Sequence, residues 1–188
     1  AKLGRPVEAG AAFDRAITAR PDRHDTYAQI LAHLCAHGRL DEALAIYRRA
    51  SSHTSADPYW RVYFALWIVG AQRRAQNTSD STASEVLREI TGDGWQENLA
   101  HYYAGTLGYA DLLQSADSAG KRAEAFFYEA VNLLARNDRA RAVALLRDVV
   151  ATNMMGYFEY EMAVAILQDL REPAVVPAAN ASAAAPRP

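Results

Sequence analysis

Gly38-Arg39-Leu40-Asp41-Glu42-Ala43 reveals the architecture of this chain, because the earlier stretch Gly4-Arg5-Pro6-Val7-Glu8-Ala9 has the same pattern of glycine, arginine and alanine. The two stretches begin 34 positions apart, and further pairs of small or aromatic residues keep the same interval. A fixed interval with matching residue types indicates an internal structural repeat. The matching pairs are Ala9 and Ala43, Phe13 and Tyr47, and Ala16 and Ala50.

The residue types in the repeat fit two antiparallel helices joined by a tight turn. Glycine adopts positive φ in such a turn at little cost, and the alanines allow two helices to approach closely. Phe13 and Tyr47 fill the space beside the alanines, and Pro21 ends its helix because proline has no N–H to donate. A 34-residue helical hairpin is typical of the tetratricopeptide repeat (TPR). The alternative is a generic helical bundle with a coincidental period.

The sequence also predicts helices in the rest of the chain up to residue 170. Trp60, Tyr63 and Trp67 share one helical face because they are three and four positions apart. A later pair over residues 123–150 turns at Asn137-Asp138, where asparagine tolerates the left-handed conformation. We expect the other helices over residues 81–90, 95–104, 109–115 and 157–170.

The sequence therefore predicts an all-α, TPR-type helical-hairpin solenoid, an α-α superhelix, over residues 1–170. This domain would hold about three to four repeats and a closing helix. Residues 171–188 are rich in alanine and proline and almost lack core-forming side chains. We expect this tail to be disordered.

Composition limits the class of partner. The 188 residues carry 20 Lys and Arg against 22 Asp and Glu, with a net charge of −2. Phosphate binding needs clustered basic residues, and a membrane helix needs about 18 uninterrupted apolar residues. The sequence contains neither pattern. We expect no nucleic-acid partner and no membrane insertion by this chain.

Few residues offer catalytic or metal-binding chemistry. His33 and His37 lie four apart and share a helical face, so they could bind a metal, but histidines near a helix end explain them as well. Cys35 could be a nucleophile, yet a base two positions away on a helix points elsewhere. We interpret Cys35 as a buried, inert thiol. The sequence predicts a non-enzymatic protein with no cofactor and no metal.

A resemblance to the TPR family places a binding groove on the inner wall of the superhelix, which the first helix of each repeat forms. Aromatic residues exposed in such a groove are usual anchors for a partner. Phe127 and Tyr128 follow Phe126, which we expect to face the core, so at least one of them should face outward or into the groove. Ordinary packing is the alternative. The expected partner-binding groove contains Asp25, Arg61, Ala65, Phe127, Tyr128 and Val131.

The groove so defined is mostly apolar and carries one arginine, Arg61, which argues against a carboxylate clamp of the kind found in chaperone-binding TPRs. It suits a hydrophobic helix or extended segment. That segment could belong to another protein or to a second copy of this chain, which would make a homodimer.

A narrower resemblance rests on four stretches of the later sequence. The first stretch, residues 94–105, is an expected helix that begins with tryptophan and ends in Tyr-x-Gly, and the second, residues 124–128, contains Phe-Phe-Tyr. The third is the Asn-Asp turn at residues 137–138, and the fourth, residues 149–153, ends in Ala-Thr-Asn. Their order resembles the C-terminal half of the NlpI-type lipoproteins of Gram-negative bacteria. One departure is Glu129-Ala130, where the family pattern has a glycine.

The resemblance implies a protein–protein interaction scaffold or adaptor, often homodimeric, in the periplasm or at the outer membrane; otherwise the chain would be cytoplasmic. One alternative is a structural TPR segment of a larger bacterial assembly. Another is an accessory domain beside a catalytic domain.

Overall fold

The computed structural model describes residues 6–53 and 57–172, and every regular element within these ranges is an α-helix. The prediction of an all-α fold is confirmed. The ten described helices are α1 (Pro6–Ala19), α2 (His24–Ala36), α3 (Leu40–His53), α4 (Pro58–Arg74), α5 (Thr82–Glu89), α6 (Trp95–Ala104), α7 (Tyr109–Gln114), α8 (Ala119–Ala135), α9 (Arg139–Ala151) and α10 (Phe158–Asp169).

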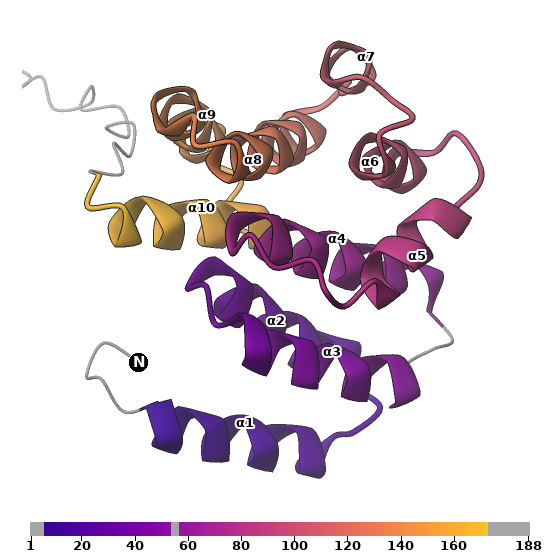
Figure 1. Cartoon of the computed structure of the whole chain (residues 1–188), viewed down its shortest axis with the longest axis vertical. Coiled ribbons are helices and arrows are strands. Elements are labelled where there is room, and N and C mark those ends of the chain that lie inside the picture. The colour runs from indigo at the N-terminus through magenta and orange to yellow at the C-terminus, as the bar shows by residue number, and fades with distance from the viewer. Residues whose placement is uncertain (1–5, 54–56, 173–188) are drawn as a thin grey trace, which may run out of the picture.

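Helices that are neighbours in sequence pack against each other along the chain (Figure 1). Helix α1 lies at one end, α2 and α3 form the next layer, α4 and α5 follow, and α6 to α9 lie at the other end. The short connections make this order favourable, because they hold consecutive helices side by side. None of the described helices is both long and apolar enough to cross a membrane.

Helix α10 departs from this order. It returns to pack on α2 as well as on α8 and α9, although α2 lies more than a hundred residues earlier in the chain. Helix α2 also contacts α4, and α4 contacts α8. These four helices, α2, α4, α8 and α10, therefore form a closed ring of contacts around the main core.

The core of this ring is mostly aromatic and aliphatic. Trp67, Phe127 and Tyr128 are among the largest fully buried side chains. Gly70 allows α4 and α8 to approach closely, because a Cβ at this position would lie 3.1 Å from Val131 Cγ1. Burial of side chains of this size supplies the main driving force for packing the ring.

The turns follow the chemistry that the sequence indicates. Gly38 has a φ of +67° and Asn137 a φ of +61°, so both of the predicted turn residues adopt the left-handed conformation. Side chains cap the helices that follow. Asp57 accepts a hydrogen bond from Tyr59 N at 3.0 Å at the start of α4, and Ser118 accepts one from Lys121 N at 3.2 Å at the start of α8.

The predicted helix boundaries agree with the structure to within a few residues. The largest shift is at α8, which begins at Ala119 rather than at residue 123. Gly4 of the first turn and residues 173–188 of the predicted disordered tail lie outside the described residues.

Gly38 provides a test of the turn by a single substitution. Gly38→Ala should lower the free energy of unfolding by about 1 kcal/mol, because alanine at a φ of +67° is strained although no atom lies within 4 Å of the added Cβ. The matched control is Gly10→Ala in α1, where the added Cβ also meets nothing within 4 Å. The control should instead raise stability by roughly 0.5–1 kcal/mol, as urea denaturation of both variants would measure.

Candidate functional site

Four of the six predicted groove residues lie inside the protein. Ala65, Phe127, Tyr128 and Val131 are all less than 5% exposed. The expectation that Phe127 or Tyr128 faces outward is wrong, since both are packed in the core and Phe126 is the partly exposed member of the trio. Helix α8 therefore turns a different side to the core than the sequence predicts: Phe127 and Tyr128 face inward in place of Phe126.

The other two predicted groove residues are exposed, and each forms an ion pair with a neighbouring side chain. Asp25, near the start of α2, forms an ion pair with Arg23 at 2.7 Å. Arg61, near the start of α4, forms one with Glu89 at 3.0 Å. The structure does not bring the six predicted residues together on one surface.

The physical reason is the position of α10. In an open stack of hairpins, the first helices of the repeats line a free inner wall. Here α10 packs against α2 and α8, two of the helices that the sequence predicts to line this wall. The side chains that would face an open groove become the core of the ring instead.

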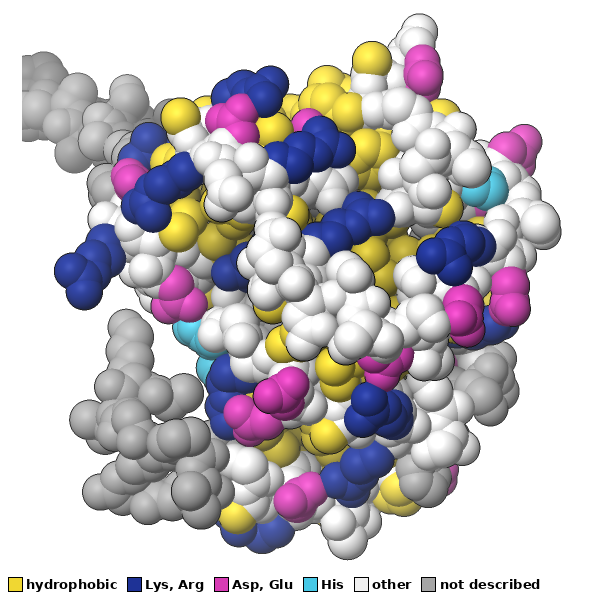
Figure 2. Space-filling view, viewed as in Figure 1, with side chains coloured by type: hydrophobic (Ala, Val, Ile, Leu, Met, Phe, Trp, Pro, Cys, Tyr) yellow, Lys and Arg dark blue, Asp and Glu magenta, His cyan; other side chains and the backbone are white. Residues whose placement is uncertain are grey.

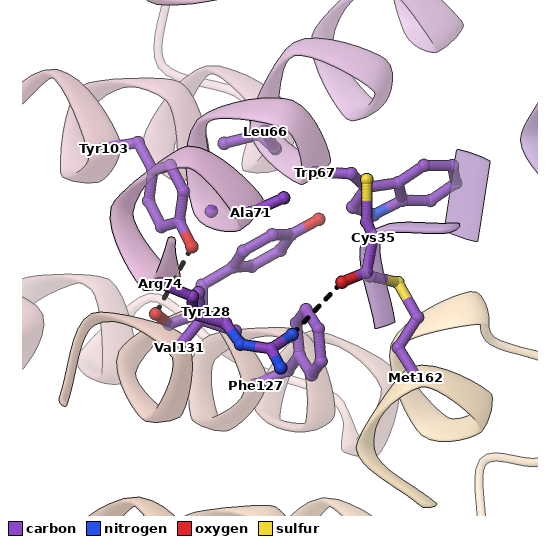
Figure 3. Close-up of a pocket in the computed structure, with 11 residues that line it drawn as sticks. Cys35, Leu66, Trp67, Ala71, Arg74, Tyr103, Phe127, Tyr128, Val131 and Met162 are labelled. Atoms are coloured by element: carbon purple, nitrogen blue, oxygen red, sulfur yellow. Dashed lines mark hydrogen bonds between the residues drawn. The ribbon is translucent and has the colours of Figure 1, made fainter. Parts of the chain in front are cut away.

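A small cavity lies within this ring (Figure 3). It has a volume of about 10 Å³ and is lined by residues of α2, α4, α6, α8 and α10. A water molecule needs at least about 10–15 Å³, so the cavity is too small for a ligand. Arg74 lies at its edge and donates hydrogen bonds to the carbonyls of Cys35 at 3.1 Å and Ala36 at 3.3 Å, which caps the end of α2.

Cys35 is 1% exposed, and burial raises the pKa of its thiol to about 12. The thiol is therefore protonated at neutral pH, and the prediction of a buried thiol is confirmed. The ring centroids of His33 and His37 lie 4.7 Å apart, and His37 Nδ1 lies 2.9 Å from Asp169 Oδ2. Within residues 6–53 and 57–172, no group of three or more His, Cys, Asp or Glu side chains could hold a metal ion.

Two glutamates, one on α8 and one on α10, are buried among aromatic side chains of α4, α6 and α8. Glu124 is 3% exposed and accepts hydrogen bonds from Tyr63 Oη and Trp95 Nε1, both at 2.6 Å. Glu159 is 2% exposed, and its Oε1 accepts from Tyr128 Oη at 2.8 Å and Trp67 Nε1 at 3.0 Å. Neutral aromatic donors, rather than a cation, satisfy both carboxyl groups.

This environment favours the protonated carboxyl. Burial, followed by repulsion from Glu159, raises the pKa of Glu124 to about 8. Burial likewise raises the pKa of Glu159. The position of Glu159 in the first turn of α10 opposes this, because the positive end of the helix dipole favours a carboxylate there. The pair is closed to solvent and therefore stabilises the fold rather than contacting a ligand.

A more open cleft lies between α8 and the segment that joins α6 to α7. Its volume is about 530 Å³. Residues 102–105 and 107–109 form one wall, residues between 129 and 136 of α8 form the other, and Arg73 of α4 also lines it. This volume lies within the range of about 300–1,000 Å³ that is typical of ligand-binding clefts.

Polar side chains at the base of the cleft are joined in a hydrogen-bond chain. Arg73 Nη1 donates to Asn132 Oδ1 at 2.7 Å, and Asn132 Nδ2 donates to Tyr102 Oη at 2.9 Å. The Tyr102 hydroxyl in turn donates to a carboxylate oxygen of Glu129. Tyr102 and Asn132 are buried, so this chain holds the polar groups of the cleft in fixed positions.

Two further contacts, both with Tyr103, hold the Arg73 side chain in place. Its Nη2 donates to the carbonyl of Tyr103 at 2.5 Å, and its guanidinium carbon lies 4.6 Å from the centre of the Tyr103 ring. Arg136 is exposed, and among the described residues its guanidinium makes no hydrogen bond or ion pair. The cleft thus contains one fixed and one free guanidinium beside a wall of tyrosines.

This cleft was not predicted from the sequence. The sequence predicts its helices and the end of the tryptophan helix at Gly105, but nothing in it places Arg73 and Asn132 beside that segment. Lys, Arg, Asp and Glu side chains are also interspersed over the face shown in Figure 2, so charge alone does not mark the cleft. No protein-family model and no curated protein matches this chain.

Proposed function

We propose that this chain is a non-enzymatic scaffold or adaptor that binds a segment of another protein in the cleft between α8 and the α6–α7 segment. The observation that carries the proposal is the combination of about 530 Å³ of space with one wall of tyrosines and preorganised polar groups. Aromatic side chains supply contact area at a low cost in conformational entropy, and fixed polar groups set the orientation of the partner.

The helical hairpins and the 34-residue repeat support the assignment of the first part of the chain to a TPR-type stack. In this proposal, the stack positions the cleft rather than providing an inner groove. A place in the bacterial envelope and a homodimeric state remain part of the proposal through the resemblance to the NlpI-type lipoproteins. A second copy of the chain would then be one form of the protein partner.

A peptide-display selection tests the function with random sequences, so no particular partner has to be chosen. Random peptides are selected on the immobilised chain and then tested against a variant with a blocked cleft, Ala135→Trp. Ala135 lines the cleft and is partly exposed, so the larger side chain fills the opening without entering the core. The proposal expects the selected peptides to lose binding to this variant.

Tyr109 should be the main anchor in the cleft wall. Tyr109→Ala should weaken the selected peptides by about ten-fold, because a partly buried tyrosine in a cleft is a frequent binding hot spot. Tyr59→Ala is the matched control, since Tyr59 is 45% exposed and lies outside the cleft. Fluorescence anisotropy measures both. Binding that is lost with Tyr59→Ala and kept with Tyr109→Ala would place the site elsewhere and overturn the proposal.

A further inference from the structure

The charged groups that line the cleft between α8 and the α6–α7 segment are Arg73, Arg136 and Glu129. Glu129 already accepts a hydrogen bond from the Tyr102 hydroxyl. Arg73 donates only to neutral oxygens, those of Asn132 and Tyr103, and keeps further N–H groups for a ligand. Neither arginine has a carboxylate partner among the described residues.

We infer that the segment bound in this cleft carries acidic side chains, whose carboxylates contact Arg136 and Arg73. The inference rests on the proposed function and names the chemistry of the partner. A guanidinium matches a carboxylate with two parallel hydrogen bonds, and such charge-assisted bonds are about twice as strong as neutral ones. The cleft is lined by two guanidinium groups and one carboxylate, so its charged groups sum to a net positive charge, and neither guanidinium forms an ion pair within the described chain.

The two arginines lie at different depths. Arg73 is partly buried and fixed by Asn132, by a carbonyl and by the Tyr103 ring. Arg136 is exposed at the rim, near the Tyr102 phenol, where its charge lowers the pKa that burial of Tyr102 raises. Two cations at separate depths fit acidic side chains along a segment better than a single chain terminus, which presents its charge at one point.

The tyrosines account for the rest of the recognition. Tyr109 is partly buried in the cleft wall, and burial raises the pKa of its hydroxyl to about 12, so the ring remains neutral at physiological pH. A neutral aromatic wall beside two guanidiniums suits a segment in which acidic residues alternate with apolar residues. The overall charge of −2 would repel such a segment at long range, so the local arrangement in the cleft must provide the attraction.

Two pools of synthetic, fluorescein-labelled peptides of about eight residues test the inference. One pool has Glu fixed at alternate positions, the other has Gln at the same positions, and both are amidated at the C-terminus so that no terminal carboxylate is present. By anisotropy, the Glu pool should bind at least about ten-fold more tightly than the Gln pool. Added salt should reduce this difference.

Arg136→Gln should weaken the Glu pool by about five- to ten-fold and leave the Gln pool unchanged. Arg61→Gln is the control, because Arg61 is an exposed arginine outside the cleft that is paired with Glu89. Equal binding of the two pools, or no effect of Arg136→Gln, would overturn the inference. If Tyr109→Ala still weakens both pools, the cleft binds peptides and only the acidic preference fails. If neither pool binds in a Tyr109-dependent way, the proposed function fails as well.

Discussion

Raising the pH from about 5 to about 9 should lower the free energy of unfolding of this chain by roughly 3–5 kcal/mol. The cause is Glu124, whose pKa rises from 4.5 to about 8 through burial and the nearby Glu159. The folded state holds a proton that the unfolded state releases. The stability that this proton provides is fully present below pH 4.5 and is lost as the pH rises through about 8. Urea denaturation at a series of pH values measures it.

Burial also raises the pKa of Glu159, which adds to the same decline, and the remaining groups change the slope only slightly. Burial lowers the pKa of His33, which makes a small contribution of opposite sign near pH 6. Burial raises the pKa of the core tyrosines Tyr63 and Tyr128 above 10, outside the window. The decline between pH 5 and 9 should therefore follow the buried acid pair.

Glu124→Gln is the control for this assignment. Its amide oxygen still accepts from Trp95 Nε1, and its NH₂ group can donate to the Tyr63 hydroxyl, so the hydrogen bonds of the pair are preserved. The variant carries no titrating proton at this position and should remove the part of the decline that Glu124 causes, while the raised pKa of Glu159 keeps the rest. A decline of the same size in the variant would show that other groups cause it.

Trp67→Ala should lower the free energy of unfolding by roughly 5 kcal/mol. Trp67 is 2% exposed in the ring of α2, α4, α8 and α10, and truncation of a buried tryptophan costs about 3–5 kcal/mol. The indole N–H also donates to Glu159 Oε1 at 3.0 Å, and its loss leaves a buried carboxyl with one fewer donor. Thermal and urea denaturation measure the effect. A variant that is unfolded at 25 °C would also be consistent with a loss of this size.

Two further variants separate the contributions. Trp67→Phe keeps most of the volume and removes the N–H, so it should cost roughly 1–3 kcal/mol. Trp60→Ala removes a partly buried tryptophan that contacts Phe64 and Phe158, and should cost less than half as much as Trp67→Ala. If Trp60→Ala and Trp67→Ala lowered the free energy of unfolding by the same amount, the core of the ring would contribute no more to stability than the partly buried Trp60.

The sequence predicts the helices of this chain well because their signals are local. Gly38 and Asn137 adopt positive φ where the sequence predicts turns, and the helices begin and end close to the predicted residues. Turn residues and helical spacing depend on a few neighbours in the chain, so a single sequence contains enough information to place them.

The orientation of α8 was not predictable in the same way. Helix α8 packs against α4, α7, α9 and α10, so buried residues occur on several of its sides. Helical periodicity identifies a core-facing side only when the opposite side is polar. In the run from Phe126 to Tyr128, it could not show which aromatic is partly exposed.

The buried acid pair and the cleft depend on contacts between distant segments. Glu124 and Glu159 are separated by 35 positions, and glutamate is normally an exposed residue, so neither position carries a sequence signal of burial. Glu159 is buried because α10 returns to the ring, and Glu124 lies against Tyr63 of α4 and Trp95 of α6. Arg73 and Asn132 likewise meet only after α4 and α8 have packed.

The most direct test of the account is amide hydrogen exchange of the chain with and without a peptide from the display selection. The proposed cleft predicts slower exchange on binding in residues 102–109 and 129–136, which form its two walls. Residues 57–63, which include the exposed Tyr59, should exchange at the same rate in both states. Slower exchange in residues 57–63 with no change in the two walls of the cleft would contradict the proposed site.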